Sequence, residues 1–203
     1  MAKSSLQTAP DSTALVTRVK NIFQESILTT RNCMEVLAPV ITQAAAHMIQ
    51  ALLSDRKILV CGNGGSAADA QHLAAELSGR FYLDRPALPA ISLSTNTSAI
   101  TAIANDFGFE HVFARQLPGV GARGDIAVAI STSGNSPNVI EAIRLAHSIG
   151  MVTFAWTGRG GGEVAKLADY ALRIDSEESP RIQEAHILAG HMLCELVERE
   201  LFG

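Results

Sequence analysis

The fold of this chain is decided by residues 57–80, KILVCGNGGSAADAQHLAAELSGR. The short apolar run at 58–61 predicts a strand that is buried on both faces of a parallel sheet. The residues that follow favour a sharp turn: Gly62, Asn63, Gly64 and Gly65. Good helix formers come next, with Ser66 as the predicted N-cap and Gly79 near the predicted end. A strand, a glycine loop and a helix N-terminus in this order offer a site for an anion, most often a phosphate.

The glycine loop also has other interpretations. Gly62, Gly64 and Ala67 match the G-x-G-x-x-A pattern of dinucleotide-binding folds. Such folds place an acidic residue at the end of the next strand to bind a ribose, whereas the strand predicted near 90–93 ends in the polar residues 94–96. A P-loop for nucleoside triphosphates requires a lysine after the loop, and none follows here. A tight turn without a ligand stays open, but a single phosphate group is the favoured interpretation.

The bulk composition favours one globular domain. The chain has 203 residues, of which 47% are hydrophobic and 18% charged, and its net charge of -4 gives no electrostatic reason to expect nucleic acid. Cys33, Cys61 and Cys194 lie far apart in apolar contexts, so we expect reduced core thiols of a cytoplasmic protein. The polar start shows no secretion signal, and no apolar stretch approaches the length of a membrane span. We therefore expect neither a nucleic acid nor a membrane as partner.

Helical and strand patterns alternate along the chain. Two apolar helices are predicted at 12–30 and 34–53, the second interrupted early by Pro39. They precede the first strand, so they must pack on the sheet or on another subunit. Strands are then predicted at about 58–61, 89–94, 125–130, 151–156 and 170–174, with helical patterns between them. This alternation predicts a doubly wound α/β fold with a five-stranded, mainly parallel sheet. We expect a single domain over 1–203, with N-terminal helices in 1–54 and an α/β core in 55–203.

A second loop rich in small polar residues follows the third strand. It comprises Ser131, Thr132, Ser133, Gly134, Asn135, Ser136 and Pro137, and a helix is predicted directly after it. Loops of this kind are often only helix caps. Two such loops at the carboxyl ends of neighbouring strands instead favour one phosphorylated ligand. Because this loop contains no lysine or arginine, its hydroxyls and backbone dipoles suit a phosphate that is bound and released.

Candidates for chemistry lie on two predicted helices. His72 and Glu76 are four residues apart, so they share one helix face and can converge on a metal or a substrate, although such pairs are also common on solvated faces. A mostly buried final helix, about 180–201, carries Gln183, His186 and His191. A buried histidine needs a hydrogen-bond partner, and taken singly each of the two is more often a core residue than a ligand.

Five segments together resemble the SIS (sugar isomerase) domain family, and within it the bacterial phosphoheptose isomerases. The segments are CGNGGSAADAQHLAAELSGR, TAIANDFG, ISTSGNSPNVIEAI, TGRGGGE and RIQEAHILAGH. The resemblance implies a homotetramer with active sites at subunit interfaces and one zinc ion per subunit. It also implies isomerisation of sedoheptulose 7-phosphate to D-glycero-D-manno-heptose 7-phosphate, the first step of ADP-heptose biosynthesis for lipopolysaccharide.

Position by position, the resemblance implies three groups of site residues. Substrate is bound by Asn63, Gly64, Gly65, Asn105 and Asp106, phosphate by Ser66, Ser131, Thr132, Ser133 and Ser136, and zinc by His72, Glu76, Gln183 and His191. Glu76 is the implied general base and His191 the implied general acid, and Glu76 and Gln183 also contact the substrate. Gln183 and His191 lie eight residues, about 12 Å, apart along a helix, which favours one of them serving the substrate more than the metal. His186 is left as structural.

Two other functions share this fold. One is a non-catalytic SIS protein that binds the bacterial replication initiator, and the other is a sugar phosphate sensor or an isomerase for a different sugar. The family resemblance implies that the initiator-binding relative lacks the glutamate and the second histidine of the catalytic set. This chain has both, as Glu76 and His191. Their presence favours an enzyme.

Overall fold

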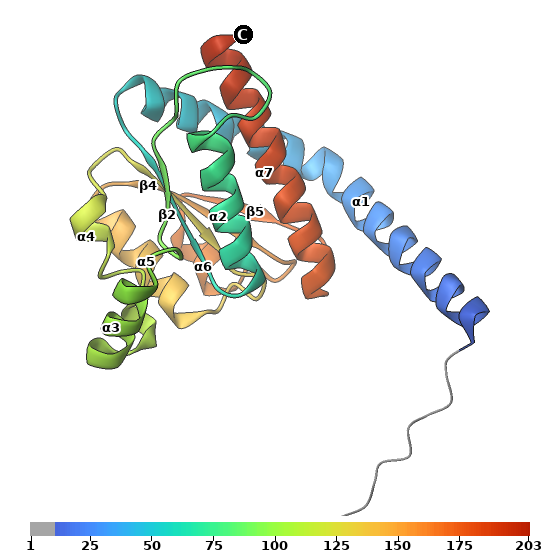
Figure 1. The fold of residues 1–203 in the computed structure, drawn as a ribbon. Helices are drawn as coiled ribbons and strands as arrows, with labels where there is room; N and C mark the ends of the chain where they lie inside the picture. The colour runs from blue at the N-terminus through green and yellow to red at the C-terminus, as the bar shows by residue number, and fades with distance from the viewer. Residues whose placement is uncertain (1–10) are drawn as a thin grey trace, which may run out of the picture.

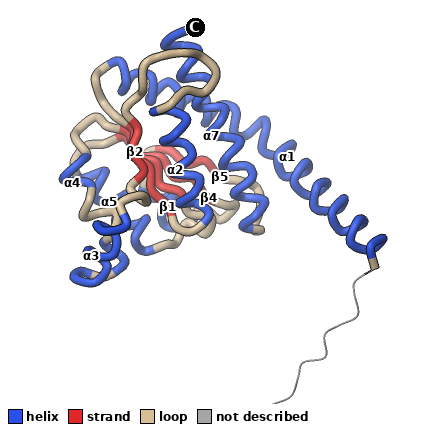
Figure 2. The backbone as a smooth tube through the Cα atoms, in the orientation of Figure 1, coloured by secondary structure: helices blue, strands red, loops and turns tan. Residues whose placement is uncertain are grey.

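The computed structural model describes residues 11–203 as a five-stranded parallel sheet between two layers of helices (Figure 1). Figure 2 shows the strands at the centre of the molecule with helices around them. The strands are β1 Ile58–Gly62, β2 Ala90–Ser92, β3 Ile126–Ile130, β4 Val152–Thr157 and β5 Tyr170–Arg173. The helices are α1 Ser12–Leu53, α2 Gly65–Ser78, α3 Thr97–Phe107, the 3₁₀ turn η1 Phe109–His111, α4 Leu117–Val120, α5 Pro137–Ser148, α6 Gly162–Leu167 and α7 Ser179–Phe202.

The order of the strands places the two predicted anion-binding loops side by side. The sheet runs β2-β1-β3-β4-β5, with every neighbouring pair parallel, which confirms the predicted fold class. β1 pairs with β2 on one side and with β3 on the other, and Gly62 lies opposite Ile130 at the carboxyl ends of β1 and β3. This is the point where the chain switches direction across the sheet, the usual place for a ligand in such folds.

The strands are buried on both faces because helices cover both faces. Ile58 and Val60 point into a core with α1, α2 and α7, whereas Leu59 and Cys61 point into a second core with α5 and α6. Alternate residues of one continuous apolar strand thus serve two cores, as expected for a parallel sheet. The helices that carry the predicted acid, base and metal ligands, α2 and α7, therefore lie on the same face.

The N-terminal region is one helix, and the prediction of two helices is wrong. α1 runs without interruption over 42 residues and contains Pro39. Residues 31–33, where a break was expected, include no glycine or proline, and Cys33 is already buried against the body of the protein. Pro39 removes one backbone hydrogen bond, and the packing of neighbouring Leu37 and Ile41 in the core stabilises the helix through this position.

The first half of α1 projects from the body of the protein and leaves apolar side chains uncovered (Figure 1). Val19, Phe23 and Ile27 are each more than half exposed. The expectation that no stretch approaches a membrane span is corrected here, because α1 contains a stretch long and apolar enough to cross one by length and composition, a test that core helices also pass. A helix with an apolar face of this kind needs a partner surface, whether protein or lipid.

Candidate active site

The glycine loop turns β1 directly into α2. Gly64 has a φ of +56°, a conformation that favours glycine, and α2 begins at the next residue. Ser66 lies inside the first turn and makes no capping hydrogen bond, so its predicted role as N-cap is wrong. Its side chain is nearly buried beneath the loop. Because the first N–H groups of a helix have no partner within the helix, those of Gly65 and Ser66 are available to an anion.

The loop after β3 brings hydroxyl groups together without using them as caps. Ser131 Oγ and Ser136 Oγ are 3.0 Å apart, although they are five residues apart in sequence. Ser136 precedes α5 but makes no side-chain capping bond. Gly134 has a φ of +66° and approaches the α6 loop so closely that an added Cβ would lie 2.9 Å from Gly162 Cα. The geometry agrees with a phosphate-binding loop and argues against the simple helix-cap interpretation. The hydroxyls of Thr132 and Ser133 lie in the same turn, Thr132 half-buried and Ser133 exposed.

A pair of asparagines joins the two loops. Asn63 Nδ2 donates to Asn138 Oδ1 (2.8 Å), and Asn138 Nδ2 donates to Asn63 Oδ1 (2.9 Å). Asn138 is almost completely buried in the first turn of α5, and the sequence analysis did not single it out. The Asn63 side chain, which the resemblance assigns to the substrate, is thus engaged in fixing the distance between the loops. The sequence did contain a signal for Asn138: it is a polar residue directly after the Ser-Pro start of a predicted helix that is otherwise largely apolar.

Gln183 lies against the glycine loop. An added Cβ on Gly65 would be 2.8 Å from Gln183 Cδ and in contact with its Nε2, so a larger residue here would displace the end of the Gln183 side chain. α2 and α7 lie side by side and run in the same direction (Figure 1). Gly65 faces Gln183 near the N-terminal ends of these helices. About two turns further along, His72 faces His191.

The histidine pair and Glu76 form the chemical centre of the site. His72 Nε2 lies 2.9 Å from His191 Nε2 and 3.4 Å from Glu76 Oε1. The side chain of His72 is 44% exposed and that of Glu76 25% exposed, so a small molecule can reach them. The centroid of the Phe81 ring lies 5.7 Å from that of the His191 ring. A carboxylate and an imidazole this close to each other can remove and return protons on one substrate.

This donor set fits a zinc ion with a small adjustment. Within residues 11–203, no three or more His, Cys, Asp or Glu side chains stand ready in the geometry of a metal site. Two imidazoles on one tetrahedral zinc need about 3.3 Å between their nitrogens, given bonds of about 2.0–2.1 Å. The His72 and His191 nitrogens are 2.9 Å apart, so a small rotation of the rings would admit an ion. Gln183 is placed beside Gly65 and therefore away from the other three predicted ligands.

Asn105 and Asp106 do not join this centre within one chain. Asn105 Nδ2 donates to Asp106 Oδ1 (2.8 Å), and both residues are exposed at the end of α3. The inner side of α3 packs against the core opposite to the one that contains α2 and α7. This pair therefore lies on the face of the sheet opposite to His72, Glu76, Gln183 and His191.

Asp69 is a residue of the site that the sequence analysis missed. It lies on α2 between Gly65 and His72, and its Oδ2 is buried without a hydrogen-bond partner. Burial raises the pKa of Asp69 to about 6, against an opposing effect of nearby His72. No pattern in the sequence marks Asp69, because what distinguishes it is the burial of one carboxylate oxygen, which only the folded structure shows.

His186 and the cysteines have structural roles, as predicted. His186 is completely buried, and its Nε2 lies 3.2 Å from the carbonyl oxygen of Thr157. Burial lowers the pKa of His186 to about 4, so it is neutral at physiological pH. Cys33, Cys61 and Cys194 are free and buried, and burial raises the pKa of Cys61 and of Cys194 to about 12. Such thiols are unreactive.

The parallel sheet and its two adjoining anion loops define a doubly wound α/β protein suited to a phosphorylated small molecule. The sequence model of the SIS domain family matches residues 23–158. A phosphoheptose isomerase of Halorhodospira halophila is 48% identical over 189 residues, 92% of this chain and 96% of that protein. One of Sulfurimonas denitrificans is 56% identical over 149 residues, 73% of this chain and 76% of that protein. The solved phosphoheptose isomerase of Neisseria gonorrhoeae has a TM-score of 0.87 at 47% identity, covering 91% of this chain and 99% of that one.

The chain belongs to the SIS domain family. Its resemblance to the phosphoheptose isomerases of that family, expected from the sequence motifs, is confirmed by relatives that match over nearly the full length.

The buried carboxyl of Asp69 makes stability depend on pH. Its folded pKa of about 6 exceeds its unfolded value of about 3.9, so the folded state holds the proton more tightly and loses stability as the pH rises from 4 to above 6. Asp69→Asn removes this loss. Since the residue is only partly buried, solvent screening reduces the gain to about 1 kcal/mol. We expect a melting temperature a few degrees higher at pH 8 and raised by only about a third as much at pH 4.5, where most of the folded-state carboxyl is still protonated. The exposed Asp84 supplies the control Asp84→Asn, and an equal change at both pH values would contradict the assignment.

Proposed function

We propose that this chain is a phosphoheptose isomerase, which converts sedoheptulose 7-phosphate to D-glycero-D-manno-heptose 7-phosphate. This reaction is the first step of ADP-heptose biosynthesis, and we place it in the cytoplasm, without a nucleic acid or membrane partner. The observation that carries the proposal is the contact of His72 with both Glu76 and His191, on helices that begin or run beside the anion loops. Relatives of this name that match over more than 90% of the chain support it.

The anion loops bind the phosphate and thereby orient the sugar. The N–H groups at the start of α2 and the hydroxyls of the loop after β3 lie at the same carboxyl edge of the sheet, which supports a shared phosphate site. The hydroxyl groups come from Ser66, Ser131, Thr132, Ser133 and Ser136, and the turn that admits the ligand comes from Gly64 and Gly65. A phosphate held away from the reacting carbons contributes binding energy that lowers the barrier.

Glu76 and His191 transfer the protons of the isomerisation. Glu76 removes a proton from C1 of the ketose while His191 donates a proton to the carbonyl oxygen at C2, which gives the enediol. His191 then takes the proton of the C1 hydroxyl as the new carbonyl forms, and Glu76 returns its proton to C2. The number of protons and electrons is unchanged overall. Proton transfer by well-placed groups contributes roughly 10² to 10⁴ in rate.

One zinc ion per subunit completes the proposed site. His72, Glu76 and His191 would hold it, and Gln183 would reach it only by leaving Gly65. A divalent ion in this position polarises a carbonyl oxygen and stabilises negative charge on it. Gln183 therefore fits a contact with the substrate better than a metal bond.

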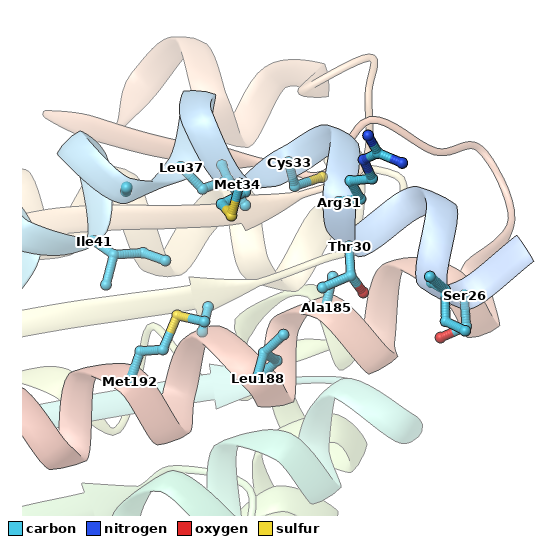
Figure 3. A pocket seen from close by; sticks show the side chains of 13 residues that line it. Ser26, Thr30, Arg31, Cys33, Met34, Leu37, Ile41, Ala185, Leu188 and Met192 are labelled. Atoms are coloured by element: carbon cyan, nitrogen blue, oxygen red, sulfur yellow. The ribbon is translucent and has the colours of Figure 1, made fainter. Parts of the chain in front are cut away.

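We further propose a homotetramer with active sites at the subunit interfaces. The uncovered apolar face of α1 continues into a groove of about 460 Å³ between α1 and α7, lined by Met34, Leu37, Ile41, Leu188 and Met192 (Figure 3). Figure 3 shows these side chains facing each other across the groove. Met192 is next to His191, so a second copy seated here would also cover the site. Another copy could likewise supply Asn105 and Asp106, which one chain holds on the opposite face.

The alternative functions lack a supporting observation. A sensor or initiator-binding protein needs the phosphate loops but has no use for a base and an acid in contact. A structure of a Vibrio vulnificus NanR protein complexed with ManNAc-6P is similar at 19% identity and a TM-score of 0.62, which shows a shared fold alone.

Conversion of sedoheptulose 7-phosphate, followed by NMR, is the direct test. We expect signals of an aldoheptose phosphate with the purified protein, a loss of conversion after chelation, and recovery when zinc is returned. Conversion that persists after complete metal removal contradicts the metal assignment. Absence of product with any metal contradicts the proposed reaction.

Replacement of the base separates binding from chemistry. We expect Glu76→Gln to bind sedoheptulose 7-phosphate with little change in affinity and to lose at least about 10² in kcat. Affinity is measured by calorimetry and kcat by the NMR assay. The exposed Glu200 on α7 supplies the control Glu200→Gln, which should keep full activity. Retained turnover in Glu76→Gln excludes it as the base.

The apolar face of α1 determines assembly. Phe23 is 66% exposed in the single chain, so Phe23→Glu should place an unpaired charge in the proposed interface. We expect light scattering to give about 86 kDa for four chains of 21.5 kDa, and a smaller mass for the variant. Lys20→Glu, on the same helix and also exposed, is the control. A monomeric wild-type protein would overturn the proposal.

A further inference from the structure

A buried ion pair joins the end of α2 to the end of α7. Arg85 Nε lies 2.8 Å from Glu198 Oε2, and their side chains are only 1% and 2% exposed. Arg85 follows α2 in the loop to β2, and Glu198 is in the last turns of α7. The loop passes over the C-terminal end of α7 (Figure 1).

Every acceptor position of the Glu198 carboxylate is used. Besides Arg85, it accepts hydrogen bonds from the backbone N–H groups of Phe81 (2.9 Å), Tyr82 (2.6 Å) and Leu83 (2.6 Å). Burial by itself raises the pKa of Glu198, but these four donors outweigh it and lower the pKa to about 2. The carboxylate is therefore charged at any pH at which the protein works, and it fixes the conformation of three consecutive loop residues.

Arg85 binds the end of α2. We call the ion pair of Arg85 and Glu198, with the hydrogen bonds that these residues make to the end of α2 and to the loop after it, the junction. Its guanidinium donates to the carbonyl oxygens of Glu76 (3.0 Å), Leu77 (2.7 Å) and Gly79 (3.3 Å), which belong to the last turn of α2 and its cap. Carbonyls at a helix C-terminus lack partners within the helix, and an arginine supplies them. One of them is the carbonyl of Glu76 itself, the residue that contacts His72.

The junction also reaches His191. Glu198 lies seven residues after His191, two turns along α7, so both are on the same face of the helix. Phe81, whose N–H donates to Glu198, places its ring centroid 5.7 Å from that of His191, a distance similar to the 5.1 Å between the rings of His72 and His191. The ion pair thus touches the backbone of Glu76 on one side and holds the aromatic ring beside His191 on the other.

We propose that Arg85 and Glu198 are a positioning pair that sets Glu76 and His191 at the distance needed for proton transfer. The hydrogen bonds of Arg85 and Glu198 reach the backbone of Glu76 but not the side chains of Glu76 and His191. Stability alone is a weak reason for such a pair, because a buried ion pair is often no more stabilising than apolar residues of similar volume. Its hydrogen bonds instead specify one register between α2 and α7. An error of about 1 Å in that register can cost roughly 10² in rate.

The test compares Glu198→Gln with the loss of another buried carboxylate, that of Asp125, far from the site. Asp125 is completely buried, binds Lys57 Nζ (2.8 Å) and accepts from two backbone N–H groups, but it lies at the end of the sheet opposite to the anion loops. We expect Glu198→Gln and Asp125→Asn to lower the melting temperature by similar amounts. Only Glu198→Gln should lower kcat, by roughly 10- to 100-fold, while KM for sedoheptulose 7-phosphate changes by less than about threefold.

A second pair of variants keeps the inference testable if Glu198→Gln does not fold. Phe81→Leu retains an apolar side chain but removes the ring beside His191, and we expect kcat to fall about threefold to tenfold. Tyr82 is the neighbouring residue in the same loop and is mostly exposed, so Tyr82→Leu should keep kcat. Equal kcat in these two variants, or equal kcat in Glu198→Gln and Asp125→Asn, overturns the positioning role.

This inference rests on the proposed isomerase activity, and the two can fail separately. A wild-type protein that does not convert sedoheptulose 7-phosphate contradicts the proposed function. An active wild type whose Glu198→Gln variant keeps kcat and loses only stability contradicts the positioning pair and leaves the function in place.

Discussion

The parallel pairing of β1 with β3 is the constraint on which the rest of the site depends. It sets Gly62 opposite Ile130, so the glycine loop and the hydroxyl-rich loop leave the sheet next to each other. Neither loop alone surrounds an anion. Asn63 and Asn138 then fix the distance between the loops with two hydrogen bonds, whose geometry depends on the strand register. A shift of β1 by one residue would exchange its two core faces and separate the asparagines.

Much of this arrangement could be predicted from the sequence because it is local. An apolar strand, a glycine turn and a helix former follow one another within 24 residues, and the same alternation recurs along the chain. Glycines, prolines and hydroxyls act on their immediate neighbours, so the loops were found correctly. The eight-residue separation of Gln183 and His191, which argued against both binding one metal ion, could also be read from the sequence. The structure places the Gln183 side chain beside Gly65.

The features that were missed depend on contacts between distant residues or on packing. Asn138, Asp69 and the pair Arg85 and Glu198 acquire their roles from partners or burial that no spacing in the sequence reveals. The continuity of α1 was missed for a related reason. Pro39 is unfavourable in an isolated helix, but the buried side chains around it compensate for the lost hydrogen bond.

The distance between the phosphate and the acid-base centre fits the proposed substrate. Gly65, at the start of α2, and His72 are seven residues apart, which is about 10 Å along the helix axis. With bonds of about 1.5 Å, an extended chain of seven carbons ending in a phosphate also reaches about 10 Å. In the proposed site, a sugar phosphate anchored at the helix N-terminus would bring its first two carbons to His72, Glu76 and His191. Because α2 supplies both ends of this span, one helix would then set the length of sugar that fits, and the ion pair of Arg85 and Glu198 joins the far end of that helix to α7.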